Sequence, residues 1–171
     1  MSMGFGFFRG FFGKKTSEIN ADELVFEVNE SGIVINGKIV DVPCHLSVLT
    51  KMLGKPRRFV GKKRENVNFT WDNLGICCYT KGNKVVYCVG VKVNIGEIRT
   101  KYEPKKLFSG RLTICGEPWE TAMSGGEDLE FGRRLIFAEH SLFSEYTDME
   151  IGDKNGCHGA YSGVEIQLPF D

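Results

Sequence analysis

Alternating apolar and polar positions predict a series of short strands near the start of the chain. Apolar side chains recur at every second position over residues 24–28, and shorter apolar runs follow at 33–35 and 38–42. A strand with one buried face has this period of two. Asn36 and Gly37 form a dipeptide that is typical of a two-residue hairpin turn. The pattern therefore predicts three antiparallel strands joined by tight turns.

One helix is predicted directly after these strands. Apolar side chains recur at spacings of three and four residues, which places them on one helix face, at Leu46, Leu49, Met52 and Leu53. Pro43 suits the first helical position, and Gly54 with Pro56 ends the helix. A helix of about ten residues needs packing against the rest of the protein to form.

The remaining apolar runs complete an α+β fold. They predict strands at 67–71, 76–79, 85–89, 111–115 and 164–168, with 76–79 and 85–89 paired as a hairpin. The run at 135–138 fits either a strand or a buried helix, because its length does not decide between them. We expect a mainly antiparallel sheet of five to seven strands with one or two helices packed on one face.

The chain of 171 residues has the length of one domain, preceded by a segment of different composition. Residues 1–20 form a Phe- and Gly-rich arm, and residues 21–171 are expected to fold as a single α+β domain. Aromatic side chains followed by Lys14 and Lys15 would suit a weak membrane-surface anchor over residues 5–15. We favour the alternative, an arm packed on the domain or on a neighbouring chain, because glycines weaken a helix there.

Six cysteines raise the question of disulfides, and their context argues against them. Cys77 and Cys78 are adjacent, so on a strand they point to opposite faces. The N-terminal sequence lacks the features of a secretory signal, and no apolar run approaches the roughly 18 residues of a membrane-spanning helix. We expect a cytoplasmic protein with reduced, buried thiols.

The histidines do not complete a recognisable catalytic or metal site. His45 follows Cys44 on the predicted helix, where neighbouring residues do not face each other, and His158 follows Cys157 in a Gly-rich loop. A cysteine nucleophile needs a base and a group that orients the base, and the sequence assembles no such set. The spacings typical of zinc, calcium and phosphate sites are also missing. We therefore expect neither an enzyme nor a bound metal or cofactor.

Charge is unevenly distributed along the chain, although the formal net charge is zero. Between 51 and 64 there are seven cations and no acid: Lys51, Lys55, Arg57, Arg58, Lys62, Lys63 and Arg64. Such a run is either a solvated loop or a site for phosphate-bearing ligands with salt-dependent affinity. Phe59 is the one aromatic residue within it, so it offers little for base stacking and we favour the solvated loop.

The segment 117–153 has the opposite character, with ten acids and only Arg133 and Arg134 against them. This segment is either a solvated face or a surface that mimics phosphate and docks on a basic partner. Trp119 would supply it with a rigid aromatic anchor. The residues that we expect to bind a partner are Glu117, Trp119, Glu120, Glu127, Asp128, Glu130, Asp148 and Glu150.

Two short motifs resemble a family of small uncharacterised enterobacterial proteins. They are Leu-Gly-Lys-Pro at 53–56 and Thr-Trp-Asp-Asn-Leu-Gly-Ile at 70–76, and the similarity covers about residues 23–95 and the last strand. Some members are encoded beside polymorphic toxins of type VI secretion or contact-dependent inhibition systems. The resemblance implies an immunity protein, which binds and neutralises one such toxin, and it identifies no binding residue.

We therefore expect a protein that neutralises a cognate antibacterial toxin by occluding its active site with the acidic segment 117–153. Under this hypothesis the partner is the toxin, no nucleic acid is bound, and membrane contact is restricted to residues 5–15. The alternative is a nucleic-acid or membrane-surface binding protein that uses the basic run 51–64 and the Phe-rich arm.

Overall fold

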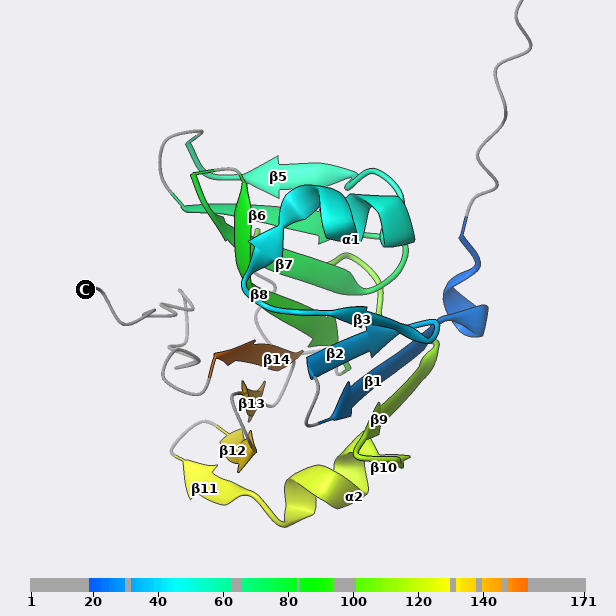
Figure 1. Cartoon of the computed structure of the whole chain (residues 1–171), viewed down its shortest axis with the longest axis vertical. Helices are drawn as coiled ribbons and strands as arrows, with labels where there is room; N and C mark the ends of the chain where they lie inside the picture. The colour runs from blue at the N-terminus through cyan, green and yellow to red at the C-terminus, as the bar shows by residue number, and fades with distance from the viewer. Residues whose placement is uncertain are drawn as a thin grey trace, which may run out of the picture.

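The computed structural model describes residues 19–29, 32–62, 66–82, 84–93, 101–129, 132–137, 140–145 and 148–153, and from residue 127 onward it describes the backbone. The helices are the 3-10 helix η1 (Ala21–Glu23), α1 (Leu46–Leu53) and α2 (Trp119–Ser124). The strands are β1 (Val25–Asn29), β2 (Gly32–Ile35), β3 (Lys38–Val40), β4 (Cys44–His45), β5 (Arg58–Val60), β6 (Asn66–Trp71), β7 (Ile76–Lys81), β8 (Val85–Lys92), β9 (Arg111–Ile114), β10 (Glu117–Pro118), β11 (Glu127–Leu129), β12 (Gly132–Phe137), β13 (His140–Glu145) and β14 (Asp148–Asp153) (Figure 1).

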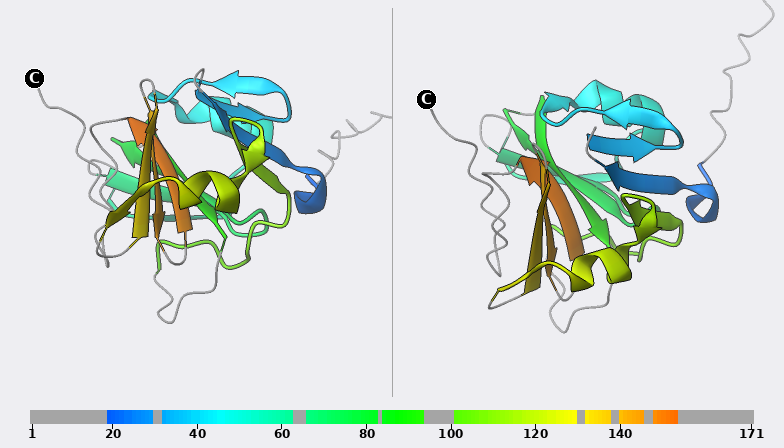
Figure 2. Two further views of the ribbon diagram at one scale, coloured as in Figure 1. Left: turned by 90° about the horizontal axis from the view of Figure 1, so that it is seen from below. Right: turned by 60° about the horizontal axis from the view of Figure 1, so that its bottom comes forward.

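These strands form two sheets. A five-stranded sheet has the order β10-β9-β1-β2-β3, and a nine-stranded sheet has the order β11-β12-β13-β14-β8-β7-β6-β5, with β4 paired to β8. Neighbouring strands are antiparallel except β1 and β9, which are parallel. In both views of Figure 2, α2 lies between the end of the small sheet and β11.

The α+β class and the mainly antiparallel pairing are confirmed, but the strands are divided between two sheets and outnumber the five to seven expected. Alternation along the chain identifies a strand from its own residues. The sheet that a strand joins depends instead on distant partners, such as Val25 of β1 opposite Arg111 of β9. Sheet membership was therefore outside what the local pattern could predict.

The two predicted hairpins over β1, β2 and β3 are confirmed. Phe26 and Val28 of β1 are fully buried, as the alternation requires. Asn36 and Gly37 have positive φ angles of 48° and 77°, which the predicted two-residue turn demands. The Asn36 side-chain oxygen also accepts a hydrogen bond from the backbone N–H of Val25 at 2.8 Å, so the turn is tied to the start of β1.

The helix α1 is confirmed, but it begins later than predicted. Pro43 does not open the helix, because the next two residues form β4 and pair with β8. His45 is the N-cap, and its Nδ1 accepts a hydrogen bond from the backbone N–H of Ser47 at 3.2 Å. Leu49 and Leu53 are buried on the face that the spacing predicted.

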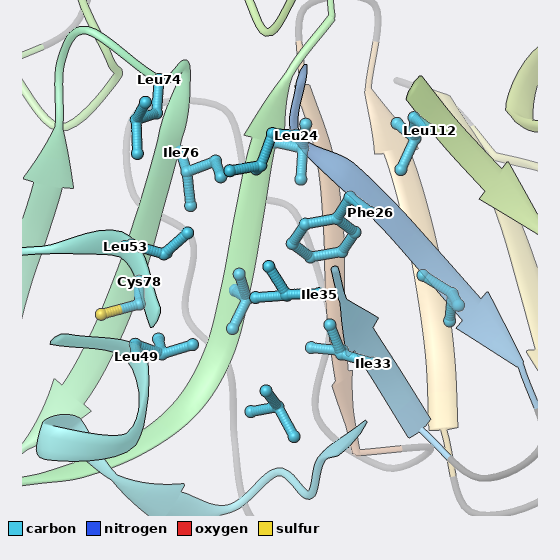
Figure 3. Close-up of a cluster of buried hydrophobic side chains, with 14 of the residues drawn as sticks. Leu24, Phe26, Ile33, Ile35, Leu49, Leu53, Leu74, Ile76, Cys78 and Leu112 are labelled. Atoms are coloured by element: carbon cyan, nitrogen blue, oxygen red, sulfur yellow. The ribbon is translucent and has the colours of Figure 1, made fainter. Parts of the chain in front are cut away.

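The hydrophobic core lies between α1 and β7 on one side and β1 and β2 on the other (Figure 3). Leu53 of α1 lies beside Ile76 of β7, Leu49 lies farther along the same helix, and these side chains face Phe26 and Ile35 across the core (Figure 3). All five are at most 3% exposed. At about 25 cal/mol per Å² of buried apolar surface, the burial of such side chains stabilises the packing of the two sheets.

The second half of the chain contains more strands than the sequence predicted. The run at 135–138 is a strand, because it falls within β12. The strands β4, β5, β10, β11, β13 and β14 were not predicted, and neither was the position of the second helix, α2. The strand expected at 164–168 and most of the arm 1–20 lie outside the described residues. No helix in the described part of the chain is long and apolar enough to cross a membrane.

Candidate functional site

Trp71 brings the two sequence motifs together in space. It lies at the end of β6, and its side chain is 1% exposed. The indole Nε1 donates a hydrogen bond to the carbonyl oxygen of Gly54 at 2.8 Å. This bond ties the Leu-Gly-Lys-Pro segment after α1 to the turn that begins at Asp72.

Asp72 forms a two-point ion pair with Arg58 of β5. The guanidinium donates from Nε to Oδ2 at 3.2 Å and from Nη2 to Oδ1 at 3.0 Å. Arg58 also donates to the carbonyl oxygen of Glu103 at 2.6 Å and to that of Lys101. Planar two-point pairing of this kind fixes orientation as well as adding energy. Arg58 and Asp72 therefore hold the segment from residue 101 against the sheet.

The same carboxylate fixes the position of Lys105. The backbone N–H of Lys105 donates to Oδ1 of Asp72 at 3.1 Å. Burial raises the pKa of Asp72, but the hydrogen bond and charge of Arg58, together with the N–H and charge of Lys105, outweigh it. The pKa of Asp72 is thereby held below its ordinary value, and the residue stays ionised at neutral pH.

Gly75 allows the segment 105–108 to lie directly on the turn. Its φ is +71°, and a Cβ there would lie 2.2 Å from the backbone nitrogen of Phe108. The backbone N–H of Lys92 donates to the Gly75 carbonyl oxygen, and the N–H of Phe108 donates to that of Lys92, both at 2.8 Å. A side chain at this position would therefore separate the segment from the turn.

A second ion pair holds the same segment from inside the protein. Lys92 Nζ lies 2.7 Å from Oε2 of Glu103, and the two side chains are 6% and 11% exposed. A buried charge is costly unless it is paired, so each side chain requires the other. Together with Arg58, this pair gives the segment 101–108 a defined place.

Three open hollows surround Asn73 and share it as a lining residue. Their volumes are about 530, 1040 and 570 Å³. Residues 50–57 line one hollow. Ala21 and Asp22 of η1, with Lys106, Leu107 and Ser109, contribute to another, and Arg57, Arg58 and Lys105 help to line the third. We call the three hollows together the Asn73 groove.

The Asn73 groove is strongly positive. Its cationic lining residues are Lys51, Lys55, Arg57, Arg58, Lys105 and Lys106. Among its described lining residues the carboxylates are Asp22 and Asp72, and Asp72 is already paired with Arg58. Positive charge from separate parts of the chain is thus concentrated around one polar side chain, which favours an anionic ligand.

The sequence predicted only half of this groove. The basic run 51–64 contains Lys51, Lys55, Arg57 and Arg58, but Lys105 and Lys106 come from another segment. The preferred interpretation of the run as a solvated loop is wrong for residues 58–60, which form β5. No local signal joins the two basic segments, because their proximity depends on bonds made by Trp71 and Asp72.

The acidic candidates near α2 lie elsewhere on the molecule. Glu117 is in β10, an edge strand of the five-stranded sheet, and Glu120 is in the first turn of α2. Both acids are exposed. Trp119 between them is partly buried and packs against the core, so part of its surface is already used within the protein.

The next two candidates are close to the arginines of their own segment. Glu127 and Asp128 lie in β11, an edge strand of the nine-stranded sheet. In the strand register, Glu127 is opposite Arg134 and Asp128 is opposite Arg133 of β12. The backbone thus places opposite charges at neighbouring positions within the segment.

The remaining candidates are divided between a central strand and a part of the chain that is not described. Asp148 and Glu150 lie in β14, opposite Lys92 and Gly90 of β8. Glu130 lies outside the described residues. The predicted partner-binding residues are therefore spread over β10, α2, β11 and β14 instead of one element, and their role in binding stays a prediction.

Cys44 and His45 have surroundings that do not suit nucleophilic catalysis. Burial, with a smaller contribution from the charge of Asp41, raises the pKa of the Cys44 thiol to about 11. A reactive cysteine needs a lowered pKa instead. His45 is occupied as the N-cap of α1. Within the described residues, no group of His, Cys, Asp and Glu side chains could hold a metal ion.

Comparison with known proteins places the chain in an uncharacterised family. A search of curated proteins and a search of solved structures found no significant match. A family model described as "Domain of unknown function (DUF7738)" matches residues 25–128. The match includes every cation of the Asn73 groove and ends within β11. The chain therefore belongs to the DUF7738 family.

Proposed function

We propose that this protein is a binding protein of the immunity type, which neutralises a toxin by docking on it and occluding its active site. The motifs at 53–56 and 70–76 support the proposal through their resemblance to proteins encoded beside toxins. The observation that carries it is the Asn73 groove, a positive surface that these motifs build.

A rigid surface favours tight docking. The Arg58–Asp72 pair and the buried Lys92–Glu103 pair hold the walls of the groove before any partner arrives. A surface that is ordered in advance loses less conformational entropy on binding, so more of the contact energy contributes to affinity. An inhibitor that must outcompete a toxin's substrate benefits from this property.

The polar groups at the groove favour binding over catalysis. Both oxygens of Asp72 accept hydrogen bonds from Arg58, and one also accepts from Lys105. A carboxylate engaged in this way, with a lowered pKa, is a weak general base at neutral pH. The described lining residues include neither a histidine nor a cysteine. Anion recognition is the chemistry that this arrangement supports.

The distribution of charge would also orient a partner. In Figure 1, α1 and β5 lie at one end of the molecule, and β10 and α2 lie at the other. Exposed Glu117 and Glu120 therefore belong to the end opposite α1 and β5, which carry Lys51 and Arg58. Separated positive and negative regions speed association in one orientation and discriminate against wrong partners.

The experiment is rescue of growth. The protein encoded by the adjacent gene is expressed in a bacterium with and without this chain, and complex formation between the purified proteins is measured by calorimetry. We expect the neighbour to stop growth and this chain to restore it through a stable complex. The proposal is refuted if the protein encoded by the adjacent gene does not stop growth when it is expressed alone. It is also refuted if that protein remains toxic when this chain is co-expressed in folded form and the two purified proteins form no measurable complex.

A further inference from the structure

We infer that the Asn73 groove receives an acidic polypeptide segment of the partner, with carboxylates on its lysines and apolar side chains between them. The inference rests on the proposed function and adds the chemistry of the ligand at one defined place.

Lysines from two walls of the groove supply the charge. Lys51 and Lys55 come from α1 and the segment after it, whereas Lys105 and Lys106 come from the segment held by Asp72. All four side chains are exposed, and none makes an ion pair with a residue that the structure describes. Their ammonium groups are therefore available to a ligand that enters between the walls.

Arg58 acts differently from these lysines, as a positioning residue. Its Nε and both of its Nη atoms donate to Asp72 and to the carbonyl oxygens of Lys101 and Glu103. Most of its donor capacity is thus used within the protein. Arg58 sets the place of the wall that carries Lys105 and leaves ligand contacts to the lysines.

The groove also contains apolar side chains that an acidic peptide can use. Ile19 and Met52 are half-buried lining residues, and Leu107 is 37% exposed. In a polypeptide, apolar side chains can stand next to carboxylates, so one segment can satisfy lysines and apolar groups together. A nucleic acid presents bases beside its phosphates, and proteins bind bases mainly by stacking on rings and by hydrogen bonds at the base edges.

Aromatic residues at the groove do not favour a nucleic acid. None of the described lining residues is Phe, Tyr or Trp, so bases have no ring on which to stack. Trp71 is buried, and Phe108 packs edge-on against Phe26 with ring centroids 6.3 Å apart. Phe59 is 57% exposed but does not line the groove. The lining therefore suits a polypeptide better than single-stranded DNA or RNA.

The test uses the full chain and short labelled probes at about 0.15 M salt, where the Debye length is about 8 Å, with binding followed by fluorescence anisotropy. The probes are a peptide that mixes Glu with Leu, the same peptide with Gln for Glu, and an oligothymidylate of equal charge. The groove variant is Lys105→Glu with Lys106→Glu. Lys38→Glu with Lys84→Glu is the matched control, because both lysines are exposed, do not line the groove and change the net charge equally.

We expect the Glu peptide to bind, the Gln peptide to bind at least roughly tenfold more weakly, and the groove variant to lose a similar factor, about 1.4 kcal/mol. The control variant should bind within about twofold of the native chain, because distant exposed charges are screened. Circular dichroism spectra that match the native chain show that the variants are folded.

Three outcomes overturn the inference: no binding of the Glu peptide, binding that survives in the groove variant, or an oligothymidylate that binds as tightly as the peptide. Sedimentation is a further check, because self-association that the groove variant abolishes would assign the groove to a second copy. Growth rescue separates this inference from the proposed function. A groove variant that still neutralises the neighbour overturns the inference alone, whereas a native chain that fails to rescue overturns the proposed function.

Discussion

Asp72 connects more parts of the groove than any other side chain described above. Its carboxylate accepts from Arg58 of β5 and from the backbone N–H of Lys105, and it lies directly after Trp71, which binds Gly54. Strand β5, the turn and the segment that carries Lys105 therefore meet at one carboxylate. Such a group should matter both for stability and for the shape of the binding surface.

Asp72→Asn is expected to lower the free energy of unfolding by about 1–3 kcal/mol at neutral pH, because an amide cannot form the charge-assisted pair with Arg58. The pKa of Asp72 is lowered in the folded protein from the ordinary value of 3.8. The contribution of the Asp72 charge to the free energy of unfolding is therefore fully present at pH values above 3.8, and it is lost as the pH falls through the pKa of the folded protein. Urea unfolding of both proteins from neutral to acidic pH measures this difference.

The difference between the native chain and Asp72→Asn should shrink toward the acid end of the series. Asp41→Asn is the control, because it removes an exposed carboxylate away from the Arg58 pair. Equal losses in the two variants, or a loss from Asp72→Asn that does not depend on pH, would contradict the assigned role of the ion pair.

Gly75→Ala should be more harmful than Gly37→Ala. Both glycines have a positive φ, at +71° and +77°, so alanine costs about 1–2 kcal/mol of backbone strain at either position. A Cβ at Gly37 meets no atom within 4 Å, whereas at Gly75 it meets the backbone of Phe108. We expect Gly75→Ala to lose roughly 1–3 kcal/mol beyond the loss in Gly37→Ala, measured by urea unfolding. Equal losses of stability in the two variants would show that the segment 105–108 can move away from the turn at Gly75 at little cost.

The elements differ in how far their own residues specify them. Strands β1 to β3 and the β7–β8 hairpin follow from alternation and turn residues, so the sequence predicted them. Strand β5 has only three residues, the first of which is the cation Arg58, and it exists through its pairing with β6, including Phe59 opposite Phe69. A local pattern cannot reveal a strand that depends on its neighbour in this way.

Helix α1 offers a prediction at the scale of the element. His45→Ala should lower stability by about 0.5–2 kcal/mol, because the first turn of the helix loses the acceptor for the backbone N–H of Ser47. His45→Asp supplies another side-chain acceptor at the N-cap and should retain most of the stability. Thermal unfolding followed by circular dichroism measures both variants. Equal losses of stability in His45→Ala and His45→Asp would mean that His45 does not stabilise the helix by accepting a hydrogen bond at the N-cap.

At the scale of the whole molecule, charge is separated although the net charge is zero. The groove cations come from α1, β5 and the segment 101–108, whereas exposed Glu117 and Glu120 lie on β10 and α2. Under the proposed function the two regions are alternative docking surfaces. The sequence favours the acidic one, and we propose the positive one because six cations line the Asn73 groove.

Charge reversal can decide between these two surfaces. In the complex with the neighbouring protein, Lys105→Glu with Lys106→Glu should reduce the association rate roughly tenfold or more at low salt, with a smaller effect at high salt. Glu117→Lys with Glu120→Lys should leave the rate nearly unchanged. Stopped-flow or surface-binding kinetics over a salt series measure both. If the Glu117→Lys with Glu120→Lys variant associates more slowly and the lysine variant does not, the docking surface lies at β10 and α2 instead.

The α+β class, the turn at Asn36 and Gly37, and the buried face of α1 could be predicted from the residues alone, because each depends on positions close together in the chain. The division into two sheets, and the grouping of Lys51 and Lys55 with Lys105 and Lys106 around Asn73, became visible in the folded protein. The physical reason is that strand pairing and ion pairs such as Arg58–Asp72 join segments whose spacing along the chain carries no signal. Local periodicity predicts which face of a helix or strand is buried, whereas long-range hydrogen bonds determine which other elements lie beside it.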